Sequence, residues 1–163
     1  MLRRTPAGAR ALVQSGERVL AWSTVGAGTE ETYAVATDRA LYIPVPDPIR
    51  IPWELVTKAT WGEDLVLVVE GRTDERGRDR AWRVRIDDPR VLPTVVYERV
   101  TSIIVVSEHV AFEGDVGARF VGRRAGEGLR WTITFDPGLD PRDPELRRRA
   151  NEALAELRST LGV

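Results

Sequence analysis

The sequence predicts an α+β protein in which short strands form a bent antiparallel sheet or partial barrel that one helix caps. Residues 17–106 hold a succession of short strand-like segments separated by glycine and proline turns, with one helical segment late in the run. After them, three more strand-like segments predict a meander, and an amphipathic helix follows. We therefore expect an appendage over 1–16, a bent sheet over 17–106 and a meander with its helix over 107–163, the last two packed as one unit.

Composition sets limits on the class of protein. The 163 residues, 42% hydrophobic and 30% charged, fit one globular domain or one domain with an elaboration. Without a long apolar run or a signal-like start, the chain is expected to be soluble and cytoplasmic. The absence of cysteine excludes disulfides, thiolate metal sites and cysteine nucleophiles. The net charge of −1 gives no global argument for nucleic acid or an anionic membrane.

The amino-terminal appendage is expected to hold one short helix. Threonine is a good N-cap and proline fits the first helical position, so the helix is predicted to open with Thr5 and Pro6. Ser15 and Gly16 follow at a position suited to its end.

A hairpin is expected next. Residues 18–25 and 31–37 have strand patterns around a glycine-rich turn at 26–28. Asp38 and Arg39 then make a tight turn, in which the Asp38 carboxylate accepts backbone N–H bonds. We interpret Asp38 as structural rather than catalytic.

Three prolines interrupt the strands after Ile43. Proline cannot donate to a sheet ladder, so the segment with Pro44, Pro46 and Pro48 is expected to be a loop or an unprotected edge, and a candidate interaction lip. Beyond it, Trp53 and Trp61 are expected to pack, with exposure as an apolar interface patch as the alternative.

The second part of the bent sheet combines strands and a helix. Residues 65–70 form a strand candidate, and the alternation of residues 82–87 places Trp82, Val84 and Ile86 on one face. A helix is predicted over 94–101. A strand is expected to begin near Ser102, with a helix that continues to Ser107 as the alternative.

The carboxy-terminal part is predicted as a meander and a helix. Residues 118–124 form one strand, and Trp131, Ile133 and Phe135 mark the buried face of the next. Asp143 is a good N-cap before Pro144, and Gly162 can end the helix. Its apolar stripe consists of Leu146, Ala150, Ala153, Leu154, Leu157 and Leu161. Arg147, Arg148 and Arg149 are interpreted as a solvated face.

These motifs support a resemblance. The run from Ala36 to Tyr42, followed by Ile51 to Val56 and Ala59 to Trp61, resembles bacterial pleckstrin-homology-like domains over roughly residues 17–106. The chain is also similar to uncharacterised actinobacterial proteins with an added carboxy-terminal region, which agrees with a basic set that is arginine throughout except for Lys58. The resemblance implies a fold that hosts lipid, peptide and protein binding, and it transfers no ligand.

Catalytic and metal motifs are largely missing. Ser107 and His109 would share a strand face, and Asp115 could orient the imidazole, but a structural or exposed histidine is the preferred interpretation. One histidine without cysteine disfavours zinc. The acidic run Asp136, Asp140, Asp143 and Glu145 is better explained by turns and capping than by a hard cation. No catalytic, cofactor or metal residue is predicted, and we expect no enzyme.

The positive feature is a group of arginines on two adjacent strands: Arg119, Arg123, Arg124 and Arg130. Arginine binds carboxylate and phosphate through a planar fork. A solvated face balanced by Glu113, Asp115 and Glu127 is the simpler alternative. The sequence predicts a non-catalytic protein-interaction or scaffold module. Peripheral binding of anionic lipid or nucleic acid through these arginines is the alternative, and the oligomeric state stays open.

Overall fold

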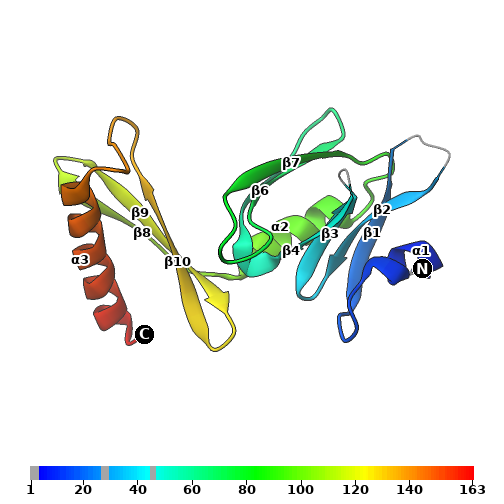
Figure 1. Ribbon diagram of the computed structural model, residues 1–163, viewed down its shortest axis with the longest axis horizontal. Coiled ribbons are helices and arrows are strands. Elements are labelled where there is room, and N and C mark those ends of the chain that lie inside the picture. The colour runs from blue at the N-terminus through cyan, green and yellow to red at the C-terminus, as the bar shows by residue number, and fades with distance from the viewer. Residues whose placement is uncertain (1–3, 27–29, 45–46) are drawn as a thin grey trace. The chain divides into compact units, whose positions relative to one another are not determined.

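The computed structural model describes residues 4–26, 30–44 and 47–163 (Figure 1). The chain divides into two compact units, Met1–Ser102 and Ile103–Val163. Within the described residues, ten strands in three antiparallel sheets and three α-helices make an α+β protein, as predicted. Residues 104–106, placed with the first region from sequence, belong to the first strand of the second unit.

The first unit opens with a short helix and a four-stranded sheet. The elements are α1 (Ala7–Leu12), β1 (Val19–Val25), β2 (Thr32–Thr37), β3 (Ala40–Pro44) and β4 (Pro48–Pro52), and the strands lie in the order β1-β2-β3-β4. The helix has Pro6 as its N-cap with no side-chain cap bond, so the predictions of Thr5 as the cap and of Pro6 as the first helical residue are both wrong. The Pro6 carbonyl accepts the Arg10 N–H at 3.0 Å, the first bond of the helix, so the helix begins one residue later than predicted.

A corner leads from β4 to a three-stranded sheet. The 3₁₀ turn η1 (Trp53–Leu55) precedes β5 (Val56–Trp61), β6 (Val66–Gly71) and β7 (Arg80–Arg85), which lie in the order β5-β6-β7. An isolated antiparallel bridge between Val25 and Ile86 links the two sheets at the opposite corner. Helix α2 (Leu92–Ser102) contacts β5 and η1 as well as β1 and β2. The strands thus bend around a shared core without closing into a barrel.

The two tryptophans near this corner behave differently. Trp53 is buried, and its indole N–H donates to the Thr37 carbonyl at 2.8 Å, as a buried indole requires. Trp61, at the end of β5, is 37% exposed. The packing role predicted for both is therefore confirmed for Trp53 alone.

The tight turn after β2 is stabilised by two side chains. The Thr37 hydroxyl accepts the backbone N–H groups of Arg39 and Ala40, at 3.1 and 2.9 Å. The Asp38 carboxylate accepts the N–H of Arg18 at 2.8 Å, and this bond lowers the pKa of Asp38. The structural role predicted for Asp38 is confirmed. Its hydrogen bond from Arg18, however, joins the turn to the residue that precedes β1.

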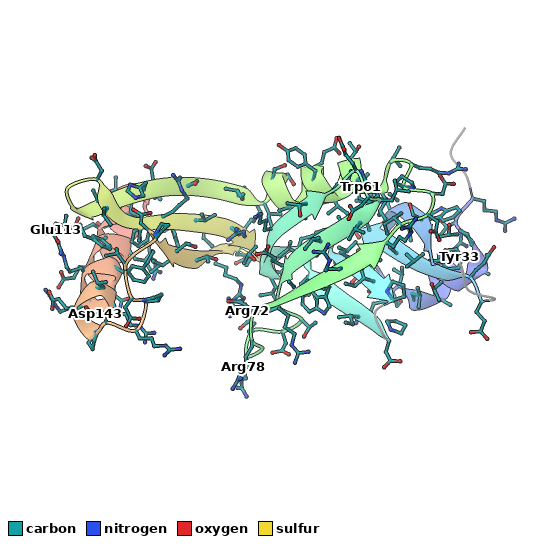
Figure 2. All side chains as sticks on the ribbon, turned by 90° about the horizontal axis from the view of Figure 1, so that it is seen from above. Tyr33, Trp61, Arg72, Arg78, Glu113 and Asp143 are labelled. Carbon is teal, nitrogen blue, oxygen red and sulfur yellow. The ribbon has the colours of Figure 1, made fainter. Side chains whose placement is uncertain are left out.

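The second unit is a meander backed by one helix. Its strands β8 (Ile104–Glu113), β9 (Val116–Ala125) and β10 (Gly128–Phe135) lie in the order β10-β9-β8, and α3 (Pro144–Leu161) follows. Asp143 caps α3 by accepting the N–H of Glu145 at 2.8 Å, and Gly162 ends it with φ of 72°. Figure 2 labels Glu113 at the end of β8 and Asp143 at the start of α3.

Candidate functional site

The sheet of the second unit has one packed face and one open face. Ala118 and Phe120 on β9 are buried against Ala150 of α3. Val110, Phe112, Trp131, Ile133 and Phe135 pack around them from the neighbouring strands. Because side chains alternate along a strand, Arg119, Val121 and Arg123 lie on the opposite face. In residues 103–163, all of which are described, α3 is the only helix, so that second face has no helix of this unit over it.

Strand register defines the residues of this open face. Ser107 pairs with Val121 and His109 with Arg119 across β8 and β9. Across β9 and β10, Thr134 pairs with Arg119, Thr132 with Val121, and Arg130 with Arg123. Directly paired residues point to the same side of a sheet. The open face therefore includes Ile104, Ser107, His109, Arg119, Val121, Arg123, Arg130, Thr132 and Thr134.

Arg119 is the exposed cation at the centre of this face. It lies on the middle strand, and its Nη1 donates to the Ser107 hydroxyl oxygen at 3.2 Å. One polar contact leaves further guanidinium N–H groups to bind a carboxylate or another planar acceptor. Arg119 is thus the open-face side chain best placed to contact a partner.

His109 and Asp136 form a pair beside Arg119. His109 Nε2 lies 2.8 Å from Asp136 Oδ2, and both side chains are about one-third exposed, at 31% and 28%. Asp136 Oδ2 also accepts the Gly117 N–H at 2.7 Å. The backbone bond from Gly117 and the bond from His109 lower the pKa of Asp136. Asp136, rather than the predicted Asp115, is therefore the carboxylate that orients His109.

Two of the predicted arginines, Arg123 on β9 and Arg130 on β10, occupy directly opposite positions at one end of the open face. Arg123 is only 5% exposed, and its Nη1 donates to the Thr132 hydroxyl oxygen at 2.9 Å. Burial lowers the pKa of Arg123. Arg130, its cross-strand partner, is half-buried. These two arginines therefore offer less charged surface than the sequence suggests.

Arg124 lies on the packed side of the sheet. It follows Arg123 on β9 and pairs with Leu129, so its Cβ points to the side that carries α3, and the residue is exposed. The four predicted arginines consequently do not share one face: Arg119, Arg123 and Arg130 lie on one side and Arg124 on the other.

The proline lip of the first unit forms the end of a hairpin. Pro44 ends β3 and pairs with Pro48, which begins β4, while Pro46 lies outside the described residues. The Trp53 N–H donates to the Arg39 carbonyl, and the same register continues through Ile51 and Leu41.

This register determines what β4 presents at its free edge. Alternation along an antiparallel ladder directs the backbone groups of Pro48, Arg50 and Pro52 away from β3. Two of these three positions lack an N–H. The prolines thus protect this edge against the addition of another strand.

The acidic run before α3 is accounted for by local contacts. Asp136 bonds His109 and Gly117, Asp140 accepts the Arg142 N–H at 2.9 Å, and Asp143 caps the helix. Glu145 pairs with Arg148 at 2.6 Å. Among the described residues, no group of three or more His, Cys, Asp or Glu side chains is arranged to hold a metal ion. The interpretation as turns and caps is supported for Asp140 and Asp143. Asp136 instead contacts His109 and Gly117, and Glu145 pairs with Arg148.

A buried ionic cluster in the first unit was not predicted from sequence. The Glu17 side chain is 2% exposed and receives Arg50 Nη2 at 2.6 Å and the Thr37 hydroxyl at 2.7 Å. The Tyr42 hydroxyl donates to Glu17 at 3.1 Å and accepts the Gln14 N–H at 3.0 Å. The pKa of Arg50 is raised: desolvation acts to lower it, but the hydrogen bonds that Arg50 donates to Glu17 and Tyr42 outweigh that effect. These residues lie on separate segments of the chain, so no local sequence motif indicates the cluster. Their buried contacts indicate a structural role, in which the cluster holds the segments together.

A shallow cleft also lies in the first unit. It has a volume of about 360 Å³ and is lined chiefly by Trp22, Tyr33 and the segment around Asp88 and Arg90. The Tyr33 hydroxyl donates to Glu31 at 2.5 Å, which raises the pKa of Tyr33, and Arg90 pairs with Asp88 at 2.5 Å. The charged side chains Glu31, Asp88 and Arg90 of this cleft thus already have partners within it.

Comparisons with known proteins identify neither a family nor a function. No family model, no curated protein and no solved structure matches the chain. Over residues 4–26, 30–44 and 47–163, no helix has both the length and the apolar character needed to cross a membrane.

Proposed function

We propose that this chain is a non-catalytic protein-interaction module, and that its contact surface is the open face of the β8–β10 sheet centred on Arg119. The observation that carries the proposal is the contrast between the two faces of that sheet. One face is packed on α3, and the other presents Arg119 beside Ser107 and the His109–Asp136 pair. Arginine is enriched in protein interfaces relative to the rest of the surface.

The distribution of charge favours a protein partner over a polyanion. Binding to a nucleic-acid backbone or an anionic membrane draws on several exposed cations that act together. Here Arg123 is buried, Arg124 lies on the other side of the sheet, and Asp136 brings a carboxylate next to His109. A single exposed arginine with mixed neighbours fits an acidic group on a folded protein better.

We further propose that the first unit is a pleckstrin-homology-like domain. A four-stranded sheet, a three-stranded sheet and then a helix that contacts both agree with the resemblance drawn from sequence. The bridge between Val25 and Ile86 at one corner agrees with a partial barrel. Because this fold hosts several kinds of ligand, the functional proposal rests on the second unit.

A capture experiment with two matched variants tests the proposed function. Arg119→Glu and Arg124→Glu change exposed arginines of the same strand that lie on opposite faces. The tagged full chain and both variants, each checked for folding by circular dichroism, are incubated with extract from the source cells at low and moderate salt.

We expect one protein to be captured stoichiometrically at both salt concentrations by the wild type and Arg124→Glu, and to be lost with Arg119→Glu. Retention of that protein by Arg119→Glu would contradict the proposed surface. Capture of only nucleic acid or lipid, lost steeply as salt rises, would instead favour the polyanion alternative.

A further inference from the structure

The edge strands of the described sheets differ in how they are protected. On β4, proline occupies two of the three positions whose backbone groups face outward. On β8, the pairing with β9 has irregularities between Ile104 and Val106 and between Ala111 and Glu113. Such bulges disturb the edge of a sheet and discourage another strand from pairing there.

Strand β10 has no comparable protection. Its eight residues pair with β9 in one uninterrupted register from Gly128 to Phe135. They include no proline, and Arg130 is the only charged residue among them. Long, regular edges rich in aromatic and β-branched residues are sites of strand addition.

The register also tells which backbone groups face the free edge. The Asp136 N–H donates to the Gly117 carbonyl at 2.9 Å, which continues the β9–β10 ladder. Since pairing alternates, the even-numbered residues of β10 bond to β9 and the odd-numbered residues direct their N–H and C=O outward. The outward set is Leu129, Trp131, Ile133 and Phe135, whose side chains lie on the α3 side and are all half-buried.

We propose that two copies of this chain associate through their β10 edges, in an antiparallel pairing with Thr132 on the two-fold axis. This register uses all four outward-facing residues: Trp131 faces Ile133 of the second copy, and Leu129 faces its Phe135. Shifting the axis to the next equivalent position would require Glu127 or Pro137 in the ladder. Aromatic and β-branched cross-strand neighbours are favourable pairs.

Charge and polarity also fit a second copy. Arg130 faces Thr134 of the other chain, so the two Arg130 side chains lie on opposite sides of the axis and no like charges meet across the edge. Every apolar residue remains on the α3 side and every polar residue on the open-face side. The result is a continuous six-stranded sheet with both α3 helices on one side, in the isologous arrangement of a two-fold dimer.

Single-cysteine variants test this register, because the chain has no cysteine of its own. Thr132→Cys places one thiol beside its symmetry mate, in a pair without direct hydrogen bonds, where the side chains are closest. Thr134→Cys is the matched control on the same strand and face, since its symmetry mate lies several residues away. We expect mild oxidation to give a disulfide-linked dimer with Thr132→Cys and a monomer with Thr134→Cys. Equal cross-linking of both, or of neither, would overturn the proposal.

Sedimentation equilibrium on the full chain provides a second readout that needs no cross-link. The wild type should show a monomer–dimer equilibrium in the micromolar range. Thr134→Glu, which would face Arg130 of the other copy twice per dimer, should tighten the association about tenfold, and Thr134→Lys should weaken it about tenfold. A wild type that stays monomeric throughout, or variants that do not move the equilibrium in opposite directions, would overturn the proposal.

Discussion

Glu17 shows how a single buried carboxylate joins separate segments of the first unit. Glu17 lies just before β1, and its carboxylate accepts hydrogen bonds from Arg50 on β4, Tyr42 on β3 and Thr37 on β2. Removing one partner of a buried pair leaves a desolvated charge without compensation. The cluster is therefore expected to affect stability mainly when one of its partners is removed, which lowers the free energy of unfolding.

We expect Arg50→Ala to lower the free energy of unfolding by about 2 kcal/mol, below the usual range for a fully buried pair because Arg50 is 27% exposed. Urea unfolding followed by tryptophan fluorescence measures the change. Arg85→Ala serves as the control, since Arg85 is 68% exposed and lies 3.8 Å from Asp87. If both substitutions changed the free energy of unfolding by the same small amount, the cluster would not contribute to stability as proposed.

Asp136 gives the second unit a pH-dependent contribution to stability. Its pKa is lowered by the Gly117 N–H and by His109, so the folded state favours the carboxylate. For such a group, the stabilisation is present above the ordinary pKa of 3.8 and is lost as pH falls through the lower folded value.

We therefore expect Asp136→Asn to lower the melting temperature at neutral pH, and the difference from wild type to shrink below about pH 4. Thermal unfolding at a series of pH values measures it. A difference that is the same at pH 7 and pH 3 would mean that the contribution of Asp136 does not depend on its charge.

At the scale of the elements, the backbone of β8 leaves no room for a side chain at Gly117 of β9. A Cβ built there would lie 1.9 Å from the Val110 carbonyl oxygen and 2.7 Å from the Ala111 Cα. Backbone atoms cannot move aside as a flexible side chain can. Glycine is required at this position by close packing.

Gly117→Ala should destabilise the second unit by about 2 kcal/mol or more, because β8 must shift to make room. Gly128→Ala, on the neighbouring strand, is the matched control, since a Cβ there would meet nothing within 4 Å. Circular dichroism during denaturant titration compares them. Similar stabilities of the two variants would contradict the close approach.

Elements with strong local signals could be predicted from sequence. The Asp143 cap and the Gly162 end of α3 are confirmed, because capping depends on residues close in the chain. Of the predicted apolar stripe, Ala150, Ala153, Leu154 and Leu157 pack against the sheet, whereas Leu161 is exposed. Trp82, Val84 and Ile86 are buried, as alternation predicts. The helix over 94–101 is confirmed with wider bounds, and the strand after it begins at Ile104 rather than continuing the helix.

The candidate site could be predicted only in part. Parity along β9 correctly placed Arg119 and Arg123 on one face, and the same parity puts Arg124 on the other. The burial of Arg123 and the pairing of His109 with Asp136 depend on strand register and tertiary contact. His109 and Asp136, which are 27 positions apart in sequence, come together only once β9 has paired with both β8 and β10.

At the scale of the whole molecule, the chain is two compact units with different surfaces. The first unit bends its strands around a core under α2 and protects its β4 edge with proline. The second has a sheet with one face on α3, and no helix of that unit lies over the other, on which Arg119 is exposed and Arg123 is buried. The proposed protein contact uses that open face, and the proposed self-association uses the β10 edge, so substitutions can separate the two.

The most direct test of the proposed function is the affinity of the captured, purified partner for Arg119→Glu and for Arg124→Glu, measured by titration calorimetry. A charge reversal at the centre of an interface should weaken binding at least tenfold, whereas Arg124→Glu should leave it within about twofold of wild type. Equal affinities for the two variants would contradict the assignment of the open face as the contact surface.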